Sequence, residues 1–377
     1  MALTRALVRI PSVNPLLEPG GAGEEAVARR AADWLDGWGF EVALAEVAPG
    51  RWNVVGRRGP AGGPSLMLNG HLDTVGVEGM QVDPFAGDLV DGRILGRGAC
   101  DMKAGVGALL AAAAATRHDD LEGRLIVALT CDEEHASLGM QAVVVAERAD
   151  MAVVCEPTGL AVMPAHKGFV WAEAVFEGRA AHGSRPEVGV DAVRHAGRFL
   201  VALESLDPSL GERPAHPLLG RGSWHAGTIE GGDAPSVYPA RCRLVLERRT
   251  LPDETADAVM AEFGAVLEEV VAGVEGLGAT LSCALFRPGS DVPAEAPVVT
   301  GLVEAARAEG LPGRVAGMTA WVDAAFLNAA GTPAVCFGPG SIEQAHTADE
   351  WVDAAEVVAA ARVLTRFVRA RLARGAG

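Results

Sequence analysis

The sequence predicts an α/β protein in which a domain with a mostly parallel sheet is interrupted by an inserted α+β domain. Three observations support this fold class. In the first part of the chain, short β-rich runs end abruptly in polar residues, and helical segments separate them. Such apolar runs are typical of strands that are buried on both faces of a sheet covered by helices. After Gly168 the runs alternate between apolar and polar residues, and from about Pro288 the first pattern returns.

The first part of the chain is expected to contain three buried strands, at residues 65–68, 124–131 and 151–155. Helices are expected at residues 24–38, which Gly39 would end, and at the alanine-rich residues 103–117. Strands that alternate with helices predict a parallel sheet. The ligand site of an open α/β sheet forms beyond the carboxyl ends of its strands, so we expect a site there.

The middle of the chain has a different pattern. Alternating runs predict antiparallel strands at residues 169–176, 222–231 and 241–249, and helices are expected at 191–206 and 255–271. The last part returns to the first pattern, with expected helices at 296–309 and 353–372 around a β-rich run at 334–337. We therefore expect a discontinuous domain made of residues 1–168 and 288–377, with residues 169–287 as the inserted domain.

Length, charge and cysteine usage restrict the function. A chain of 377 residues can form two domains with cores of their own. Its 32 Lys and Arg against 49 Asp and Glu leave a net charge of −17, which repels the phosphates of nucleic acid. Residues 1–15 lack the features of a secretory signal, and the most apolar stretch, 105–115, is too short to span a membrane. The six scattered cysteines fit a reducing compartment. We expect a cytoplasmic protein that binds neither nucleic acid nor membrane.

The polar residues at the predicted strand ends, together with a downstream histidine, form one candidate site: His71, Asp73, Asp101, Glu133, Glu134, Glu156 and His346. Five carboxylates in one cleft repel one another and take up protons unless cations neutralise them. Imidazole and carboxylate ligands without thiolate favour zinc, cobalt or manganese over calcium. The ligand count is explained by two divalent ions that share one carboxylate.

The spacing of two residue pairs indicates different roles within this site. His71 and Asp73 lie two residues apart, so on extended backbone they face the same way and Asp73 can hold the imidazole in a ligating tautomer. Glu133 and Glu134 are adjacent and would diverge on extended backbone. One of them can then bind metal while the other acts as a general base.

Five segments carry a resemblance to a known family: 70–75 (GHLDTV), 96–105 (GRGACDMKAG), 132–134 (DEE), 155–158 (CEPT) and 346–350 (HTADE). In this order they resemble the M20 metallopeptidase family, which includes acetylornithine deacetylase, succinyl-diaminopimelate desuccinylase, aminoacylase-1 and glutamate carboxypeptidases. The resemblance covers nearly the whole chain. It implies that residues 1–168 and 288–377 form the catalytic domain and that the inserted domain serves as a lid and for dimerisation.

The resemblance also implies a set of metal ligands. Asp101 would bridge two divalent ions, which we expect to be zinc, with cobalt or manganese as alternatives. His71 and Glu156 would complete one site. Glu134 and His346 would complete the other.

The same resemblance implies a reaction for the site. Glu133 would take a proton from a metal-bridging water as the resulting hydroxide attacks the amide carbonyl, and it would later protonate the departing amine. Asp73 would be a catalytic residue that acts through the imidazole it holds. The family usually has a cis peptide after the bridging aspartate, here between Asp101 and Met102.

Two residues of the inserted domain complete the implied site. His182, in the segment 181–186 (AHGSRP), resembles the histidine that reaches the partner subunit's active site and stabilises the tetrahedral oxyanion. Arg249 resembles the arginine that binds the substrate carboxylate with two parallel hydrogen bonds. Ser236 is a departure, because relatives often have Asn there. We therefore expect a homodimer through the inserted domain.

The loop at residues 338–346 (GPGSIEQAH) is most similar to acetylornithine deacetylases. The expected function is therefore metal-dependent hydrolysis of N-acyl amino acids. A dipeptidase or carboxypeptidase and a succinyl-diaminopimelate desuccinylase remain alternatives within the family, so the substrate is an N-acyl amino acid or a dipeptide. Outside the enzyme class, a non-catalytic dimeric binding relative remains possible, although the presence of Glu133 argues against it.

Overall fold

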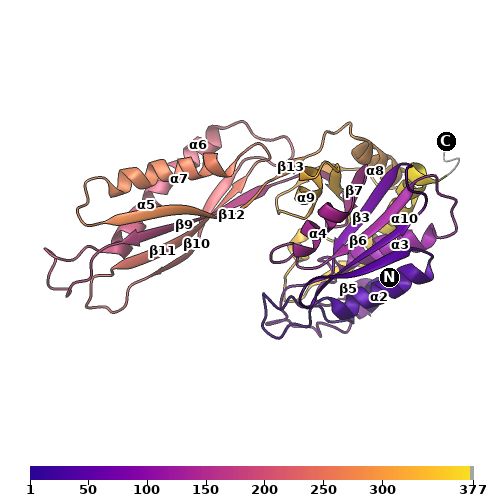
Figure 1. The fold of residues 1–377 in the computed structure, drawn as a ribbon, viewed down its shortest axis with the longest axis horizontal. Helices are drawn as coiled ribbons and strands as arrows, with labels where there is room; N and C mark the ends of the chain where they lie inside the picture. Colours follow the sequence, from indigo (N-terminus) through magenta and orange to yellow (C-terminus); the bar gives the residue numbers. More distant parts are fainter. Residues whose placement is uncertain (374–377) are drawn as a thin grey trace. The chain divides into compact units, whose positions relative to one another are not determined.

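The computed structural model describes residues 1–373, which fall into two compact units (Figure 1). The first unit contains residues 1–164, 292–316 and the chain from residue 322 onward, and the second contains residues 165–291 and 317–321. The first unit is therefore discontinuous in sequence. Among the residues described, no helix combines the length and the apolar character needed to cross a membrane.

The core of the first unit is a sheet with a parallel centre. Its strands are β1 (Glu41–Ala48), β2 (Arg51–Arg58), β3 (Ser65–His71), β6 (Arg124–Thr130), β7 (Met151–Val154), β15 (Ala334–Cys336) and β8 (Val162–His166), with β14 (Val315–Met318) beside β8. The order is β1-β2-β6-β3-β7-β15-β8-β13, where β13 (Ser290–Asp291) is antiparallel to β8, and β6, β3, β7 and β15 run parallel. This confirms the expected mostly parallel sheet. The antiparallel β1–β2 hairpin was not predicted, because β1 is rich in Ala and Glu, which favour helices.

Helices cover the sheet of the first unit. They are α1 (Ala2–Val8), α2 (Glu25–Gly37), α3 (Lys103–Ala115), α4 (Leu138–Ala146), α8 (Pro297–Ala308), α9 (Ala324–Ala329) and α10 (Ala354–Leu372). The helix α3 is buried almost throughout and packs against α1, α10 and β3. A Cβ atom at Gly105 would lie 1.8 Å from the carbonyl oxygen of Cys155, so only glycine permits this approach. The close packing brings the start of α3 next to the end of β7.

A small second sheet in the first unit joins two distant segments of the chain. It consists of β16 (Trp351–Asp353), β5 (Arg93–Leu95) and β4 (Leu89–Val90), in that order. The 3-10 helix η1 (Ile342–Gln344) precedes β16. Because β16 pairs with β5, the loop that carries His346 lies against the loop that carries Asp101.

The second unit is an antiparallel sheet with helices on one face. Its elements are β9 (Gly168–Glu177), α5 (Ala192–Leu203), α6 (Leu206–Glu212), β10 (Ser223–Gly231), β11 (Arg241–Thr250), α7 (Ala256–Val271), β12 (Gly278–Arg287) and β13 (Ser290–Asp291). The order β10-β11-β9-β12 places β9 in the centre. Phe176, Phe199 and Phe263 are fully buried in the core between this sheet and the helices α5 and α7. The strand β12 was not predicted, because a register shift between Cys283 and Leu285 breaks its alternation.

Candidate metal centre

The candidate site lies at the carboxyl ends of three parallel strands. His71 is the last residue of β3, and Glu156 follows β7 by two residues. The strand register places His71 opposite Thr130 at the end of β6, and Asn69 opposite Val154 at the end of β7. Polar residues that are far apart in the sequence therefore meet at one edge of the sheet.

Two groups of side chains could each hold a metal ion, and Asp101 belongs to both. The first group is His71, Asp101 and Glu156, and the second is Asp101, Glu134 and His346. Within each group the ligand atoms lie within 4.8 Å of one another. Nε2 of His71 lies 3.2 Å from Oδ1 of Asp101, and Nε2 of His346 lies 3.4 Å from Oδ2. Each oxygen of this carboxylate thus faces a different imidazole.

The carboxylate of Glu350 orients the loop that carries Asp101. Its Oε1 accepts hydrogen bonds from the backbone N–H groups of Cys100 at 2.8 Å and of Asp101 at 3.0 Å. Its Oε2 accepts from the backbone N–H of Gly98 at 2.9 Å and from the Arg97 guanidinium at 2.8 Å. The Asp101–Met102 peptide bond is cis, as the family resemblance implies. Glu350 is fully buried, and we did not expect a role for it.

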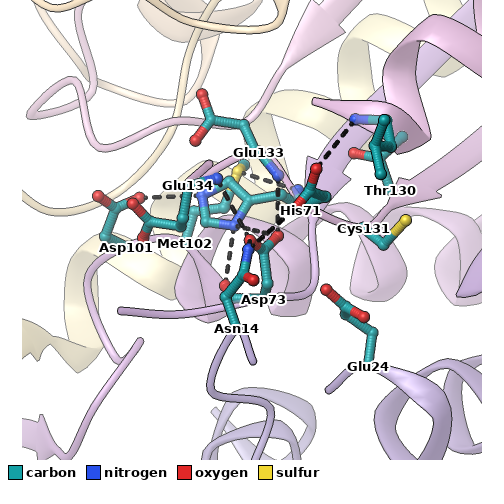
Figure 2. Close-up of polar contacts among 12 residues, drawn as sticks. Asn14, Glu24, His71, Asp73, Asp101, Met102, Thr130, Cys131, Glu133 and Glu134 are labelled. Carbon is teal, nitrogen blue, oxygen red and sulfur yellow. Dashed lines mark hydrogen bonds and ion pairs between the residues drawn. The ribbon is translucent and has the colours of Figure 1, made fainter. Parts of the chain in front are cut away.

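Asp73 connects the imidazole of His71 to the two glutamates that follow β6 (Figure 2). Its backbone oxygen lies 3.0 Å from Nδ1 of His71, while its carboxylate lies 3.7 Å from that nitrogen. The carboxylate accepts hydrogen bonds from the backbone N–H groups of Glu133 at 3.1 Å and Glu134 at 3.2 Å. The backbone oxygen, more than the carboxylate that we expected, therefore orients His71. The carboxylate holds the two glutamates.

The two glutamates lie in a turn, not on the extended backbone that we expected. The turn follows Asp132, whose φ of 67° is in the left-handed region. The carboxylate of Asp132 accepts hydrogen bonds from Arg51 at 2.7 Å and from Asn14 at 3.0 Å. Arg51 also pairs with the fully buried Glu24. A buried ionic network thus fixes the start of the turn, and sequence analysis did not find it because its members lack a motif.

The charges of the site are not balanced by the protein alone. Burial raises the pKa of Glu133 and Glu156 well above the ordinary value for a glutamate. Hydrogen bonds to Asp101 and Glu134 raise the pKa of His346 to about 10. Burial lowers the pKa of His71, but its hydrogen bond to Asp101 and the charges of Glu156 and Glu133 outweigh this effect and raise it. The cluster therefore favours added positive charge.

The donor atoms fit divalent metal ions. The two groups together offer two imidazoles and three carboxylates, a set that suits zinc, cobalt or manganese. The nearby thiols do not compete, because burial raises the pKa of Cys100 and Cys155 and keeps them neutral. Divalent cations bound by these carboxylates and imidazoles would supply the positive charge that the cluster favours.

Comparison with models of known families matches residues 67–370 to the peptidase family M20/M25/M40. The chain belongs to this family. It is 33% identical over 327 residues to an acetylornithine deacetylase of Myxococcus xanthus, covering 84% of this chain and 83% of that protein. The expected M20 resemblance is therefore confirmed, and membership of the family identifies the chain as a hydrolase.

Solved structures show the same fold as this M20 chain. A tripeptidase from Staphylococcus aureus superposes with a TM-score of 0.80 at 21% identity, covering 98% of this chain and 96% of that one. A dinuclear metal-binding peptidase of the M20 family from Bacillus subtilis has a TM-score of 0.72 at 18% identity, covering 97% and 95%. The likeness to both structures extends over nearly the whole of this chain, so the fold is that of M20 peptidases.

The remaining predicted residues of the M20 chain, His182 and Arg249, belong to the second unit. His182 is exposed, and its Nδ1 accepts a hydrogen bond from the backbone N–H of Ser184 at 3.3 Å. Arg249 donates from Nε to Glu247 at 2.6 Å, and a third of its side chain is exposed. At Ser236, where relatives often have Asn, the backbone oxygen accepts from the N–H of Gly183.

Sequence analysis missed one further carboxyl group near the metal ligands. Asp323, just before α9, is buried, and burial raises its pKa to about 7. Its charge interacts with Glu133 and Glu156. No polar pattern surrounds it in the sequence, since it follows Trp321 and Val322, so only the fold shows that it belongs to this cluster.

Proposed function

We propose that the chain is a metal-dependent amidohydrolase that cleaves the amide bond of N-acyl amino acids, as an acetylornithine deacetylase-like enzyme. The observation that carries this proposal is that Asp101 belongs to both ligand groups while Glu133 belongs to neither. The relatives named acetylornithine deacetylase support the acyl amino acid as substrate. The six free cysteines support the cytoplasm as its location.

The proposed ligands are His71, Asp101 and Glu156 for one ion and Asp101, Glu134 and His346 for the other. Zinc fits this set best, with cobalt or manganese as alternatives. Two such ions would act as Lewis acids and would lower the pKa of a water molecule at the site.

Glu133 is the proposed general base. Its carboxylate would take a proton from the attacking water at one oxygen, and the resulting carboxylic acid would then give that proton to the nitrogen of the departing amine. Burial raises the pKa of the Glu133 carboxyl above that of an ordinary glutamate, and a raised pKa strengthens a carboxylate as a base. Asp73 would position the base by accepting the backbone N–H of Glu133.

His182 and Arg249 are the proposed substrate contacts from the second unit. Nδ1 of His182 accepts the backbone N–H of Ser184 at 3.3 Å and lies 2.8 Å from Oγ of the same residue. A neutral ring with its proton on Nε2 would donate that proton to the oxyanion of the tetrahedral intermediate. Arg249 uses Nε for Glu247, and this leaves its two Nη groups for a substrate carboxylate. We propose that His182 serves the site of the partner subunit in a homodimer formed through the second unit.

The test of the function is a hydrolysis screen over N-acetyl amino acids, N-succinyl amino acids and dipeptides, with metal analysis of the same preparation. We expect bound divalent metal and hydrolysis of N-acetyl amino acids. Faster hydrolysis of dipeptides or of N-succinyl substrates would replace this function by one of the alternatives. A metal-free protein that hydrolyses none of them would contradict the enzyme assignment.

The shared site has its own test, which mixes two inactive variants. His182→Ala and Glu133→Gln homodimers are combined and allowed to exchange subunits. In a heterodimer, one site would receive both an intact Glu133 and an intact His182, so part of the activity should return. Proven exchange without recovery, or a fully active monomer in sedimentation, would contradict the claim.

A further inference from the structure

The sheet of the second unit carries aromatic and arginine side chains in two adjacent cross-strand rows. In the first row, Phe169 on β9 pairs with Arg249 on β11 and with Arg287 on β12. In the second row, Trp171 pairs with Glu247 on β11 and with Leu285 on β12. Residues paired directly across strands point to the same face of a sheet, and so do residues two apart on one strand. All six side chains therefore share one face.

This face is opposite to the one that the helices cover. The residues of β9 that alternate with Phe169 and Trp171 are Val170, Ala172 and Ala174, and they are fully buried in the core of the second unit. Trp171, in contrast, is 41% exposed. A large ring on the open face of a sheet is available to a ligand.

The rings and cations of this face are in contact with one another. The ring centres of Phe169 and Trp171 are 5.3 Å apart, and the ring of Trp321 meets Phe169 edge-on at 6.2 Å. The guanidinium of Arg249 lies 5.4 Å from the centre of Phe169, and that of Arg287 lies 5.6 Å from Trp321. We call Phe169, Trp171 and Trp321 with the two arginines the aromatic platform.

Glu247 holds two parts of the aromatic platform in place. One of its oxygens accepts the indole N–H of Trp171 at 2.8 Å, and the other accepts Nε–H of Arg249 at 2.6 Å. The orientation of the indole is thereby tied to the orientation of the guanidinium. A ligand held by the Nη groups of Arg249 would have apolar ring surface beside it.

We infer that the aromatic platform is the subsite for the side chain of the substrate amino acid, and that this side chain is aromatic or a large apolar group. The inference rests on the proposed function, in which Arg249 binds the substrate carboxylate. The side chain of an amino acid branches one bond from that carboxylate, so it falls within reach of the rings next to Arg249.

The charge of the platform distinguishes between kinds of side chain. Arg249 and Arg287 place two guanidinium groups beside the rings, and Glu247 pairs with Arg249. An aromatic side chain stacks on the rings without an electrostatic cost. The ammonium of an ornithine side chain would be placed beside two guanidinium groups, which repel it.

The size of the platform favours a small ligand over a second protein. An aromatic side chain buries about 150–250 Å² when it is fully covered. The three rings are partly covered already, whereas a stable interface buries about 800 Å² on each partner. We therefore propose that the platform binds a small ligand. The test below would detect a second copy of this chain at the platform as a change of oligomeric state.

The test compares kcat/KM for N-acetylphenylalanine, N-acetylalanine and N-acetylornithine. For the protein as it exists, we expect a preference for N-acetylphenylalanine over the other two of about 10- to 100-fold, since apolar pockets discriminate side chains on this scale. Equal rates, or a preference for N-acetylornithine, would overturn the inference while the proposed function stands. Hydrolysis of none of the three would contradict both.

Variants then assign the preference to the platform. Trp171→Ala and Phe169→Ala should lose most of the preference for N-acetylphenylalanine, because KM for this substrate should rise more than KM for N-acetylalanine. Trp171→Phe should retain the preference, which excludes a loss of folding as the cause. The matched control is Val175→Ala, on the same strand and face but about 13 Å from Trp171, given about 3.3 Å per residue. An unchanged preference in Trp171→Ala, or a change of oligomeric state in sedimentation instead, would overturn the inference.

Discussion

The two ligand groups share Asp101 but differ in burial. His71, Asp101 and Glu156 are all buried, whereas in the other group the side chain of His346 is half exposed. The difference follows from the backbone that carries each imidazole. His71 ends a central strand of the sheet, while His346 lies in a loop and has a φ of 62° in the left-handed region. One half of the site is thus part of the core, and the other half faces solvent.

The buried group makes the site rigid, and the exposed group makes it accessible. The buried group is supported by hydrogen bonds at short range, such as that of His71 to the backbone of Asp73. His346 contacts only Glu134 and Asp101 among the polar partners that the structure shows for it. Loops held by a rigid scaffold commonly carry the residues that meet a substrate. We expect the second group to hold its ion less tightly.

The largest effect is expected when the residue common to both groups is removed. Asp101→Ala should lose both metals and all measurable activity, because each group then keeps one imidazole and one carboxylate. Metal analysis after gel filtration measures this. The control is Asp349→Ala, an exposed carboxylate on the loop of His346, which should keep both metals. An Asp101→Ala protein that still carried both ions would contradict the assignment.

A somewhat smaller effect is expected at the residue outside both groups. Glu133→Gln should keep both metals and lose activity by about 10²- to 10⁴-fold, the range typical of removing a general base. The amide is the same size as the carboxyl but cannot accept the proton from water. Turnover close to normal in this variant would refute the role of Glu133 as base.

Removing the exposed imidazole should separate the two groups. His346→Ala should retain the ion of the buried group and lose the other, because Glu134 and Asp101 alone bind an ion weakly. A chelator titration should likewise remove one ion before the other in the unaltered protein. His118→Ala, an exposed histidine outside the site, is the control. Simultaneous loss of both ions would show that the groups are not distinct.

The smallest effect is expected from the network under the turn. Arg51→Met should weaken metal binding or activity by about 10- to 100-fold. Losses of this size are usual when a residue that holds a metal ligand in position is removed. The control is Arg57→Met, on the same strand, whose arginine pairs with Glu147 away from the site. This control should lower stability only. Arg51→Lys keeps the charge if the methionine variant does not fold. If Arg51→Met and Arg57→Met lowered activity equally, the buried network of Arg51 would contribute to stability only and not to the site.

Much of the fold and the site could be predicted because of local patterns. The strands β3, β6 and β7 are apolar runs that stop at polar residues, and burial on both faces of a sheet requires such runs. The strand β1 was missed because it is rich in Ala and Glu, which favour helices, and β12 was missed because a register shift breaks its alternation. The turn at Glu133 was missed because the left-handed backbone of Asp132 depends on its contacts with Arg51 and Asn14.

Local patterns in the sequence specify which chemical groups the site contains and which strand ends bring them there. Imidazoles and carboxylates at the ends of apolar runs can be recognised from residue order alone. Only the tertiary structure decided which atoms meet. Glu350 reaches the backbone of Asp101 across 249 residues of chain. The carboxylate of Asp73 lies 3.7 Å from Nδ1 of His71, as expected, and also holds two glutamates, which was not expected. Such contacts depend on how the packed helices and sheets align distant segments, and no local pattern encodes that alignment.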